Sequence, residues 1–509
     1  MPLFGGIEIP GHPCLENVAK LDRLPIPMIR RFQRLGMAID REYCWELASQ
    51  FGREMADLQK QISSYIPPDR LDEFSTKSAE IEAEQGDATL NANSAEQIRK
   101  LLFDIIGIGE GKQLKMTPDG SKVSTGKKQL ELLKSEHKIV QLVLDYRERA
   151  KLKGTYLEAL PRHAKFHPRG PDCPICGLWH EQDSWRVHGE FPTTRTDTGR
   201  LAHRNPNLAN IPARTELGAK IRLAFIASPG RSGLKMLKGD RKTVLVSNDF
   251  SQIELRGLAH CAKSESMSKV YREDKDIHLY TACAVNNLDY RHYERLISLK
   301  KEALTSEEKA DLGYFKQFCR MPAKTINFGI AYSMSASGLA AQMVLVGLDW
   351  TEQQSEEFIE RWHGLYPEIQ PYMDMNTYRA RRYGLVWDIF GRVRRIPEVR
   401  STHSWIRSAG LRQGGNQPIQ ATAAGQMKIV MGSLEGDTLD LLDQGVWCWP
   451  LVSIHDQLIF EVEEDAAQEV DSLMKWRFNS VMDDIDTGER LFRVPIGCDG
   501  EIMERWKKE

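Results

Sequence analysis

Two aspartates beside predicted buried strands constrain the fold of this chain more than any other feature. Residues 243–248 form an apolar run with several β-branched positions, which predicts a buried strand, and Asp249 follows it directly. A second apolar stretch, residues 451–462, is interrupted by a short polar segment, which predicts a tight hairpin with Asp456 at its tip. Because residues 263–435 between them have mainly helical patterns, the sequence predicts a mixed α+β fold.

The two aspartates also indicate a chemistry. Carboxylates on neighbouring strand ends can hold a pair of Mg²⁺ ions about 4 Å apart, an arrangement that activates an attacking hydroxyl and steadies a leaving phosphate. Isolated strand-end aspartates are also common as plain turn residues. Taken singly, Asp249 and Asp456 fit either role.

Residues 320–332 carry a second functional pattern. Arg320, Lys324, Phe328 and Tyr332 recur every four residues, which on a helix lines two cations and two aromatic rings along one face. Such a face suits a polyphosphate at one end and a flat ring at the other. Pro322 fits a first helical turn, so we expect the helix to begin near Arg320 with its positive end directed at phosphates. The alternative is an amphipathic surface helix with extended basic side chains.

Other segments have the composition of a nucleic-acid surface. A long predicted helix with Asp40 as its N-cap begins the segment 41–155, and a further helix over residues 130–156 ends in a basic run that includes Lys151 and Lys153. Residues 196–214 are rich in turns and in amide and guanidinium donors, which suit the minor-groove acceptors shared by all base pairs. Loop formation alone would explain the same residues.

A cysteine pair suggests a second metal. Cys173 and Cys176 are separated by two residues, and His167 and His180 are close in sequence, so two thiolates and two imidazoles could complete a tetrahedral zinc site. The histidine spacing is not that of the usual zinc finger, and a plain turn with free thiols is the alternative.

Bulk composition limits the class of protein. No uninterrupted apolar run is long enough to cross a membrane, and the amino end resembles neither a secretory signal nor a transit peptide, so we expect a cytoplasmic protein without membrane contact. The nine cysteines suit reduced thiols better than a disulfide framework. Because the net charge is −2, any positive surface for nucleic acid must be local.

Together these segments resemble the polymerase region of the family A DNA polymerases. The resemblance extends from about residue 25 to the carboxyl end, and the motifs occur in the family's order. The matching segments are residues 198–201, 206–208, 249–256 (motif A), 320–332 (motif B), 417–424 and 452–456 (motif C).

The resemblance implies a template-directed DNA polymerase that adds dNTPs to a primer 3′ end. Asp249 and Asp456 would bind two Mg²⁺ ions, for which Mn²⁺ could substitute, while the primer hydroxyl attacks the α-phosphate in line. Lys324 and Arg320 would neutralise the triphosphate, with Lys324 donating a proton to pyrophosphate.

The same resemblance assigns nucleotide and DNA contacts. His278 would assist at the phosphates, Phe328 would stack on the nucleotide, Tyr332 would guard the template position, and Glu254 would exclude a ribose 2′-hydroxyl; Gln252 is a further nucleotide contact. The implied DNA contacts are Arg200, Asn207, Arg412, Asn416, Gln420, His455, Lys151 and Lys153.

The resemblance implies a right-hand architecture. The expected parts are a lead-in over 1–40, a thumb over 41–155, a palm over 156–262 and 436–509 with an insertion at 163–188, and helical fingers over 263–435. A proofreading exonuclease would precede the thumb, so we expect a monomeric polymerase without one. It is either a stand-alone enzyme, as in phages or viruses that encode exonuclease, helicase or primase chains separately, or a trimmed form of a longer protein.

Departures from the family pattern leave two alternatives. Gln457 stands where the family usually has Glu, Ser333 replaces a usual Gly, and Pro322 replaces a small residue. The missing carboxylate at position 457 suggests, as one alternative, a primer–template binding protein with impaired catalysis. A single-subunit RNA polymerase shares the hand and is the other alternative, although Glu254 favours dNTPs.

Overall fold

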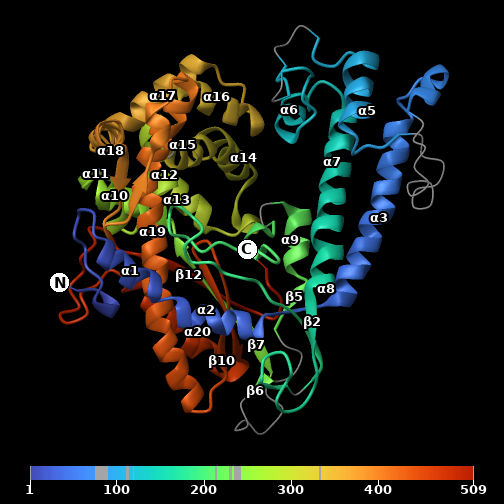
Figure 1. Cartoon of the computed structure of the whole chain (residues 1–509). Coiled ribbons are helices and arrows are strands. Elements are labelled where there is room, and N and C mark those ends of the chain that lie inside the picture. Colours follow the sequence, from blue (N-terminus) through green and yellow to red (C-terminus); the bar gives the residue numbers. More distant parts are fainter. Residues whose placement is uncertain are drawn as a thin grey trace.

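Two helical blocks flank a region of strands in this computed structural model (Figure 1). The structure describes residues 2–74, 90–110, 114–117, 120–180, 182–212, 215–227, 232–233, 242–331 and 334–507. One block contains α3 and α7, and the other contains α10 to α18, with the long helix α19 beside it (Figure 1). The mixed α+β class expected from the sequence is therefore confirmed.

The sheet that carries the two aspartates is antiparallel, with strand order β10-β11-β7-β12. Its strands are β7 (Thr243–Ser251), β10 (Cys448–Ile454), β11 (Gln457–Glu463) and β12 (Gly497–Met503). The predicted strand and hairpin are both present. β12 is an edge strand, as expected, but it begins only after Pro495, whose ring nitrogen cannot donate to a ladder.

A second antiparallel sheet has the strand order β2-β4-β1-β5. Its strands are β1 (Met37–Ile39), β2 (Ala164–His167), β4 (Ser184–Val187) and β5 (Phe225–Ile226). The two sheets are joined by a fully buried ion pair, in which Arg186 of β4 donates to Glu461 of β11 at 2.9 Å. Since a buried charge is stable only when paired, this contact fixes the sheets relative to each other.

The block around α3 has a hydrophobic core of its own, formed by residues between 62 and 146. Its helices are α3 (Arg41–Ser63), α5 (Ala95–Arg99), α6 (Lys127–Leu132) and α7 (Lys138–Leu152). Asp40 caps α3 as predicted, its carboxylate accepting from the Tyr43 N–H at 2.9 Å. The single helix expected over 130–156 is wrong, because the chain turns between α6 and α7 and then continues through a π-helical segment into α8 (Ala159–His163).

The other block is helical throughout its core. Its helices are α10 (Ile253–Cys261), α11 (Glu265–Arg272), α12 (Ile277–Asn286), α13 (Tyr290–Ser298), α14 (Ser306–Phe315), α15 (Met321–Ala331), α16 (Ala336–Leu345), α17 (Glu352–Leu365), α18 (Ile369–Tyr383) and α19 (Ser404–Asp443). The short hairpin of β8 (Leu385–Trp387) and β9 (Val393–Arg395) packs beside α18 and α19. The expected boundaries of thumb, palm and fingers stay a prediction.

The segment expected as a lead-in is part of the main core. It folds into α1 (Leu15–Arg23), α2 (Ile26–Leu35) and β1. Arg31 of α2 donates to Thr438 of α19 at 2.7 Å and to the Cys448 carbonyl at 2.9 Å. These partners are more than 400 residues away in sequence, so local pattern alone did not reveal the docking.

Within the described ranges, every helix is too short or too polar to be a candidate membrane span.

Candidate active site

The sheet β10-β11-β7-β12 brings Asp249 close to the turn that carries Asp456. Asp249 lies two residues before the end of β7, and Asp456 lies in the two-residue turn between β10 and β11. Gln457 is the register partner of Asp249, and the Phe250 N–H donates to the Asp456 carbonyl at 3.0 Å. His455, the other turn residue, has a left-handed φ of 56°, as the tight turn requires.

The strand register shows which side of the sheet carries Asp249. Its neighbour Asn248 donates to Asp471 at 3.0 Å on α20 (Ala467–Asn479), so Asp249 faces the opposite side of the sheet. Gln457 of β11 and Asp499 of β12 are its direct cross-strand partners on that side. Sequence reasoning assigned no chemistry to Asp499, since only strand register places this carboxylate beside Asp249.

Arg200 joins two of the acidic side chains. Its Nη2 donates to Glu254 Oε1 at 2.7 Å and lies 3.4 Å from Asp456 Oδ1. Burial raises the pKa of Asp456 to about 6; the carboxylates of Glu254 and Asp249 add to the rise, whereas Arg200 opposes it. The site is thus a partly compensated cluster of negative charge.

Gln252 and Glu254 are positioned by the junction of β7 and α10. Gln252 adopts a left-handed conformation with φ 54° directly before α10, and its side-chain oxygen accepts from the Tyr271 hydroxyl at 3.1 Å. Glu254 lies in the first turn of α10, which points it back toward the end of β7 and toward Arg200. The sharp turn therefore places a third carboxylate at the strand end.

The helix that carries the basic face differs from its expected form. The predicted helix does not begin at Arg320 or Met321: α15 follows without a break on a π-helical turn over Lys316–Arg320, which itself continues α14. The expectation of a free positive helix end near Arg320 is therefore wrong. A π-helical turn directly before Pro322 accommodates a residue that has no N–H to donate, so the helix continues through the proline.

The basic and aromatic residues between 320 and 328 have different environments: Arg320 ends the π-helical turn, and Lys324 and Phe328 lie in α15. Arg320 donates to Asp276 Oδ2 at 2.6 Å, whereas Lys324 is exposed. Phe328 is 37% exposed, and its ring centroid lies 5.2 Å from that of His278. Arg320, Lys324 and Phe328 keep the predicted four-residue spacing. Tyr332 and Ser333 lie outside the described residues.

Asn327 holds His278 in one orientation. The Asn327 amide donates to His278 Nδ1 at 3.0 Å, and its oxygen accepts from Trp362 Nε1 at 2.7 Å. This pairing leaves the His278 Nε2 as the protonated, donating nitrogen. Burial lowers the pKa of His278 to about 4, so the ring is neutral at pH 7. Sequence reasoning missed Asn327 because it lies off the spaced face of residues 320–332.

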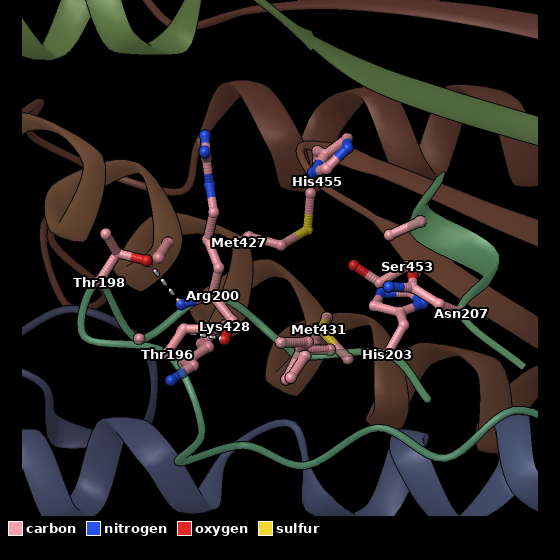
Figure 2. Close-up of a pocket in the computed structure, with 15 residues that line it drawn as sticks. Thr196, Thr198, Arg200, His203, Asn207, Met427, Lys428, Met431, Ser453 and His455 are labelled. Carbon is pink, nitrogen blue, oxygen red and sulfur yellow. Dashed lines mark hydrogen bonds between the residues drawn. The ribbon is translucent and has the colours of Figure 1, made fainter. Parts of the chain in front are cut away.

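Predicted DNA contacts line two hollows beside the aspartates. Arg200, Asn207 and His455 line a pocket of about 350 Å³ against Met427 and Lys428 of α19 (Figure 2). A larger groove of about 1,080 Å³ runs between α6 and α7 on one side and the loop and helix at residues 209–222 on the other. His455 lines both, so the hollows meet at the turn that carries Asp456.

The other predicted DNA contacts differ in their exposure and in their partners. Lys151 is exposed in the larger groove, whereas Lys153 pairs with Glu158 at 3.4 Å. On α19, Arg412 is exposed and Gln420 is half-buried. Asn416 Oδ1 is buried and has no hydrogen-bond partner among the described residues, so it is free to accept one.

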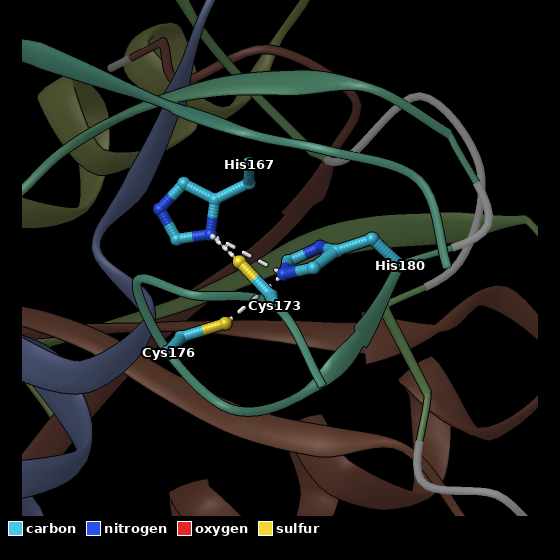
Figure 3. A group of neighbouring side chains, drawn as sticks. All are labelled: His167, Cys173, Cys176 and His180. Atoms are coloured by element: carbon cyan, nitrogen blue, oxygen red, sulfur yellow. Dashed lines mark hydrogen bonds between the residues drawn. The ribbon is translucent and has the colours of Figure 1, made fainter. Parts of the chain in front are cut away.

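A separate cluster of side chains gathers where β2 and its following loop meet. His167, Cys173, Cys176 and His180 are all buried, and their ligand atoms lie within 4.8 Å of one another (Figure 3). Burial, with Arg186 nearby, lowers the pKa of His167 to about 2 and of His180 to about 4. Both rings are therefore neutral at pH 7. The four residues are the predicted zinc set.

His188 belongs to the same cluster and was not among the predicted ligands. Its Nε2 lies 2.9 Å from His167 Nε2, and its Nδ1 lies 2.8 Å from the Gln33 carbonyl. The sequence did not distinguish His188 from the neighbouring histidines. Its contact with His167 arises only because β4, which His188 directly follows, pairs with β2.

Comparisons with known proteins agree on one family. A family model described as DNA polymerase family A matches residues 68–508. "DNA polymerase I, thermostable" of Thermus filiformis is 36% identical over 419 residues, covering 81% of this chain and 42% of that protein. DNA polymerase I of Deinococcus radiodurans is 32% identical over 504 residues, covering 98% of this chain and 43% of that protein. The chain thus spans less than half the length of these relatives.

A solved structure shares the fold. The POL domain of Pol1 from M. smegmatis, solved in complex with DNA primer-template and dNTP, matches with a TM-score of 0.72 at 24% identity. The match covers 96% of this chain and 72% of that chain. The arrangement of helices and sheet is therefore that of a polymerase domain.

Proposed function

Since the chain belongs to DNA polymerase family A, we propose that it extends primed DNA by template-directed addition of dNTPs. One observation carries the proposal: Asp249 lies on β7, and Asp456, far away in sequence, lies in the turn that leads into the adjacent strand β11. His455 of the same turn lines the larger groove. The primer 3′ hydroxyl attacks the α-phosphate of the dNTP, a new phosphodiester bond forms, and pyrophosphate leaves.

The carboxylates suit a pair of divalent cations. Asp456 is buried beside Glu254 and Asp249; burial, and secondarily these two carboxylates, raises its pKa to about 6, and a bound cation would favour its charged form. Asp249 and Asp456 would hold Mg²⁺, with Mn²⁺ able to substitute, and the ions would polarise the attacking hydroxyl and the leaving phosphate. A structural zinc ion at the His167 cluster is a separate part of the proposal.

In this proposal, Arg320 of the π-helical turn and residues of α15 and α12 bind the triphosphate. Lys324 is exposed and able to reach phosphate oxygens, and it donates a proton to the leaving pyrophosphate. Arg320 exchanges its contact with Asp276 for the triphosphate. His278 donates from Nε2 to a phosphate oxygen, and Phe328 stacks on the base.

Arg200 would change partners on DNA binding. In this structure it compensates Glu254 and Asp456, which cations would do in the loaded enzyme. Its guanidinium is then available for a minor-groove acceptor, together with Asn416, Gln420 and His455. Glu254 is left beside the sugar, where it opposes a 2′-hydroxyl.

Primer extension tests the proposal. A labelled primer–template is incubated with Mg²⁺ and either dNTPs or rNTPs, using the parent, Asp456→Ala and Asp440→Ala, which alters an exposed aspartate on α19. We expect dNTP extension by the parent and Asp440→Ala only. Duplex binding without extension under Mg²⁺ or Mn²⁺ would support a binding protein instead, and preference for rNTPs would support an RNA polymerase.

A further inference from the structure

We propose that His167, Cys173, Cys176 and His180 bind one structural Zn²⁺ ion that fastens the chain where it passes from the α7–α8 helices into the sheets. The cluster lies apart from the carboxylates, and the polymerase reaction does not use it. All four groups are protein ligands of the kinds zinc prefers, and a site with four protein ligands leaves no open position for catalysis.

The spacing of the ligand atoms matches a tetrahedral centre. With zinc–nitrogen bonds near 2.0 Å and zinc–sulfur bonds near 2.3 Å, neighbouring ligand atoms are expected about 3.3 to 3.8 Å apart. His167 Nδ1 lies 3.2 Å from His180 Nε2 and 3.5 Å from Cys173 Sγ, and Cys176 Sγ lies 3.0 Å from His180 Nε2. The separation of His167 Nδ1 from Cys173 Sγ falls within the expected range, the other two are slightly shorter, and all four ligand atoms lie within 4.8 Å of one another.

A chain of hydrogen bonds prepares His167 as a ligand. The Gln33 carbonyl can only accept, so His188 Nδ1 donates to it at 2.8 Å and His188 Nε2 carries a lone pair. His167 Nε2, at 2.9 Å, must then donate to His188, which leaves the lone pair on His167 Nδ1. That atom is the one directed at Cys173 and His180 (Figure 3). Outer partners of this kind orient zinc-bound histidines in proteins.

The charge of the centre suits its buried position. Two thiolates cancel the charge of Zn²⁺, and the two imidazoles are neutral, so the loaded centre has no net charge. The neighbouring Arg186 is already neutralised by Glu461 at 2.9 Å. Zinc can therefore bind without adding an uncompensated charge to the interior.

The centre connects three parts of the chain. His167 ends β2, which follows directly on α8. The loop that carries the cysteines is joined to α2 through Arg34 Nε, which donates to the Cys176 carbonyl at 2.6 Å. His188 joins β4 to the end of α2 through Gln33. Zinc would thus hold α2, β2 and β4 together at the base of the α3–α7 block.

Metal analysis of the full chain purified without chelator is the decisive experiment. We expect about one zinc per chain. After exchange with Co²⁺, thiolate ligation gives a charge-transfer absorption in the near ultraviolet. Both signals should be lost in Cys176→Ser and kept in Cys14→Ser, which removes a cysteine outside the cluster. Neither measurement depends on polymerase activity.

His188→Ala separates a prepared zinc site from a fortuitous cluster. Since all four ligands remain, this variant should still bind zinc, with affinity lowered about 10 to 100-fold in chelator competition. If Cys176→Ser fails to fold, the zinc affinity of His188→Ala in chelator competition still tests the proposal. The proposal is overturned if the parent contains no zinc and added Co²⁺ gives no thiolate absorption, or if thiol titration shows Cys173 and Cys176 joined in a disulfide.

Discussion

Arg200 Nη2 donates to Glu254 Oε1 at 2.7 Å, across a separation of more than 50 residues in sequence. The same nitrogen lies 3.4 Å from Asp456 Oδ1, so one cation compensates two carboxylates of the proposed active site. In the proposed enzyme, bound metal ions would take over this compensation and Arg200 would change partners. The electrostatics of the site therefore depend on Arg200.

Arg200→Met should move the pH dependence of primer extension. Because Arg200 lowers the pKa of Asp456, its removal should raise that pKa further above about 6, and half-maximal activity should require a higher pH at limiting Mg²⁺. The profile of kcat/KM against pH measures the change. Arg204→Met, which breaks an exposed pair with Glu190, should leave the profile in place. An unchanged profile for Arg200→Met would show that the arginine has no influence on the carboxylates.

Asp456→Asn should abolish extension and stabilise the fold. The pKa of Asp456 is raised from 3.8 to about 6 in the folded chain, so its contribution to stability is full below pH 4 and is lost as the pH rises through 6. At pH 7 the asparagine should increase the free energy of unfolding by on the order of 1–2 kcal/mol. Denaturation of both proteins at pH 4 and pH 7 tests this, since the gain should be present only at the higher pH.

Gln457→Glu should weaken the fold while extension survives. The buried Gln457 amide donates to Ser247 Oγ at 2.7 Å, and a glutamate loses this donor and adds a charge beside Asp249. A loss of about 1–3 kcal/mol is expected in chemical denaturation. The added carboxylate should also change the Mg²⁺ concentration needed for half-maximal extension. Gln468→Glu, on the exposed face of α20, should change neither quantity.

Glu254→Ala should admit ribonucleotides. Without this side chain, the space beside the sugar opens, and the ratio of kcat/KM for dNTP over rNTP should fall by on the order of 100-fold. Single-nucleotide incorporation with matched dNTP and rNTP measures the ratio, and Glu265→Ala on α11 is the control. An unchanged ratio would mean that another residue excludes the 2′-hydroxyl.

Glu461→Gln should destabilise the junction of the two sheets. Arg186 is fully buried, and without its carboxylate partner it becomes an uncompensated interior charge. A loss of about 3–5 kcal/mol is expected. The double variant Arg186→Met with Glu461→Leu should recover much of this loss, because neither charge then remains. Urea denaturation of the three proteins distinguishes a stabilising ion pair from one that the fold merely tolerates.

Local patterns in the sequence predicted the elements whose determinants lie within a few residues. The apolar run of β7, the hairpin around Asp456 and the cap of α3 at Asp40 were all identifiable, because strand periodicity, turn residues and capping act over short distances. The spacing of Cys173 and Cys176 also predicted that their thiols lie close to His167 and His180, while zinc binding by this cluster stays a proposal. The continuation of helix through Pro322 was not predicted, since the π-helical turn that accommodates it has no clear sequence pattern.

The sequence by itself determined β7, the hairpin around Asp456, the start of α3, the order of the motifs and the family. Only the tertiary structure decided which distant side chains meet: Arg200 with Glu254, His188 with His167, and Asp499 with Asp249. Those meetings depend on strand register and on packing between segments far apart in the chain. Sequence periodicity carries no information on such partners, because it reports which face of an element is buried and not what covers it.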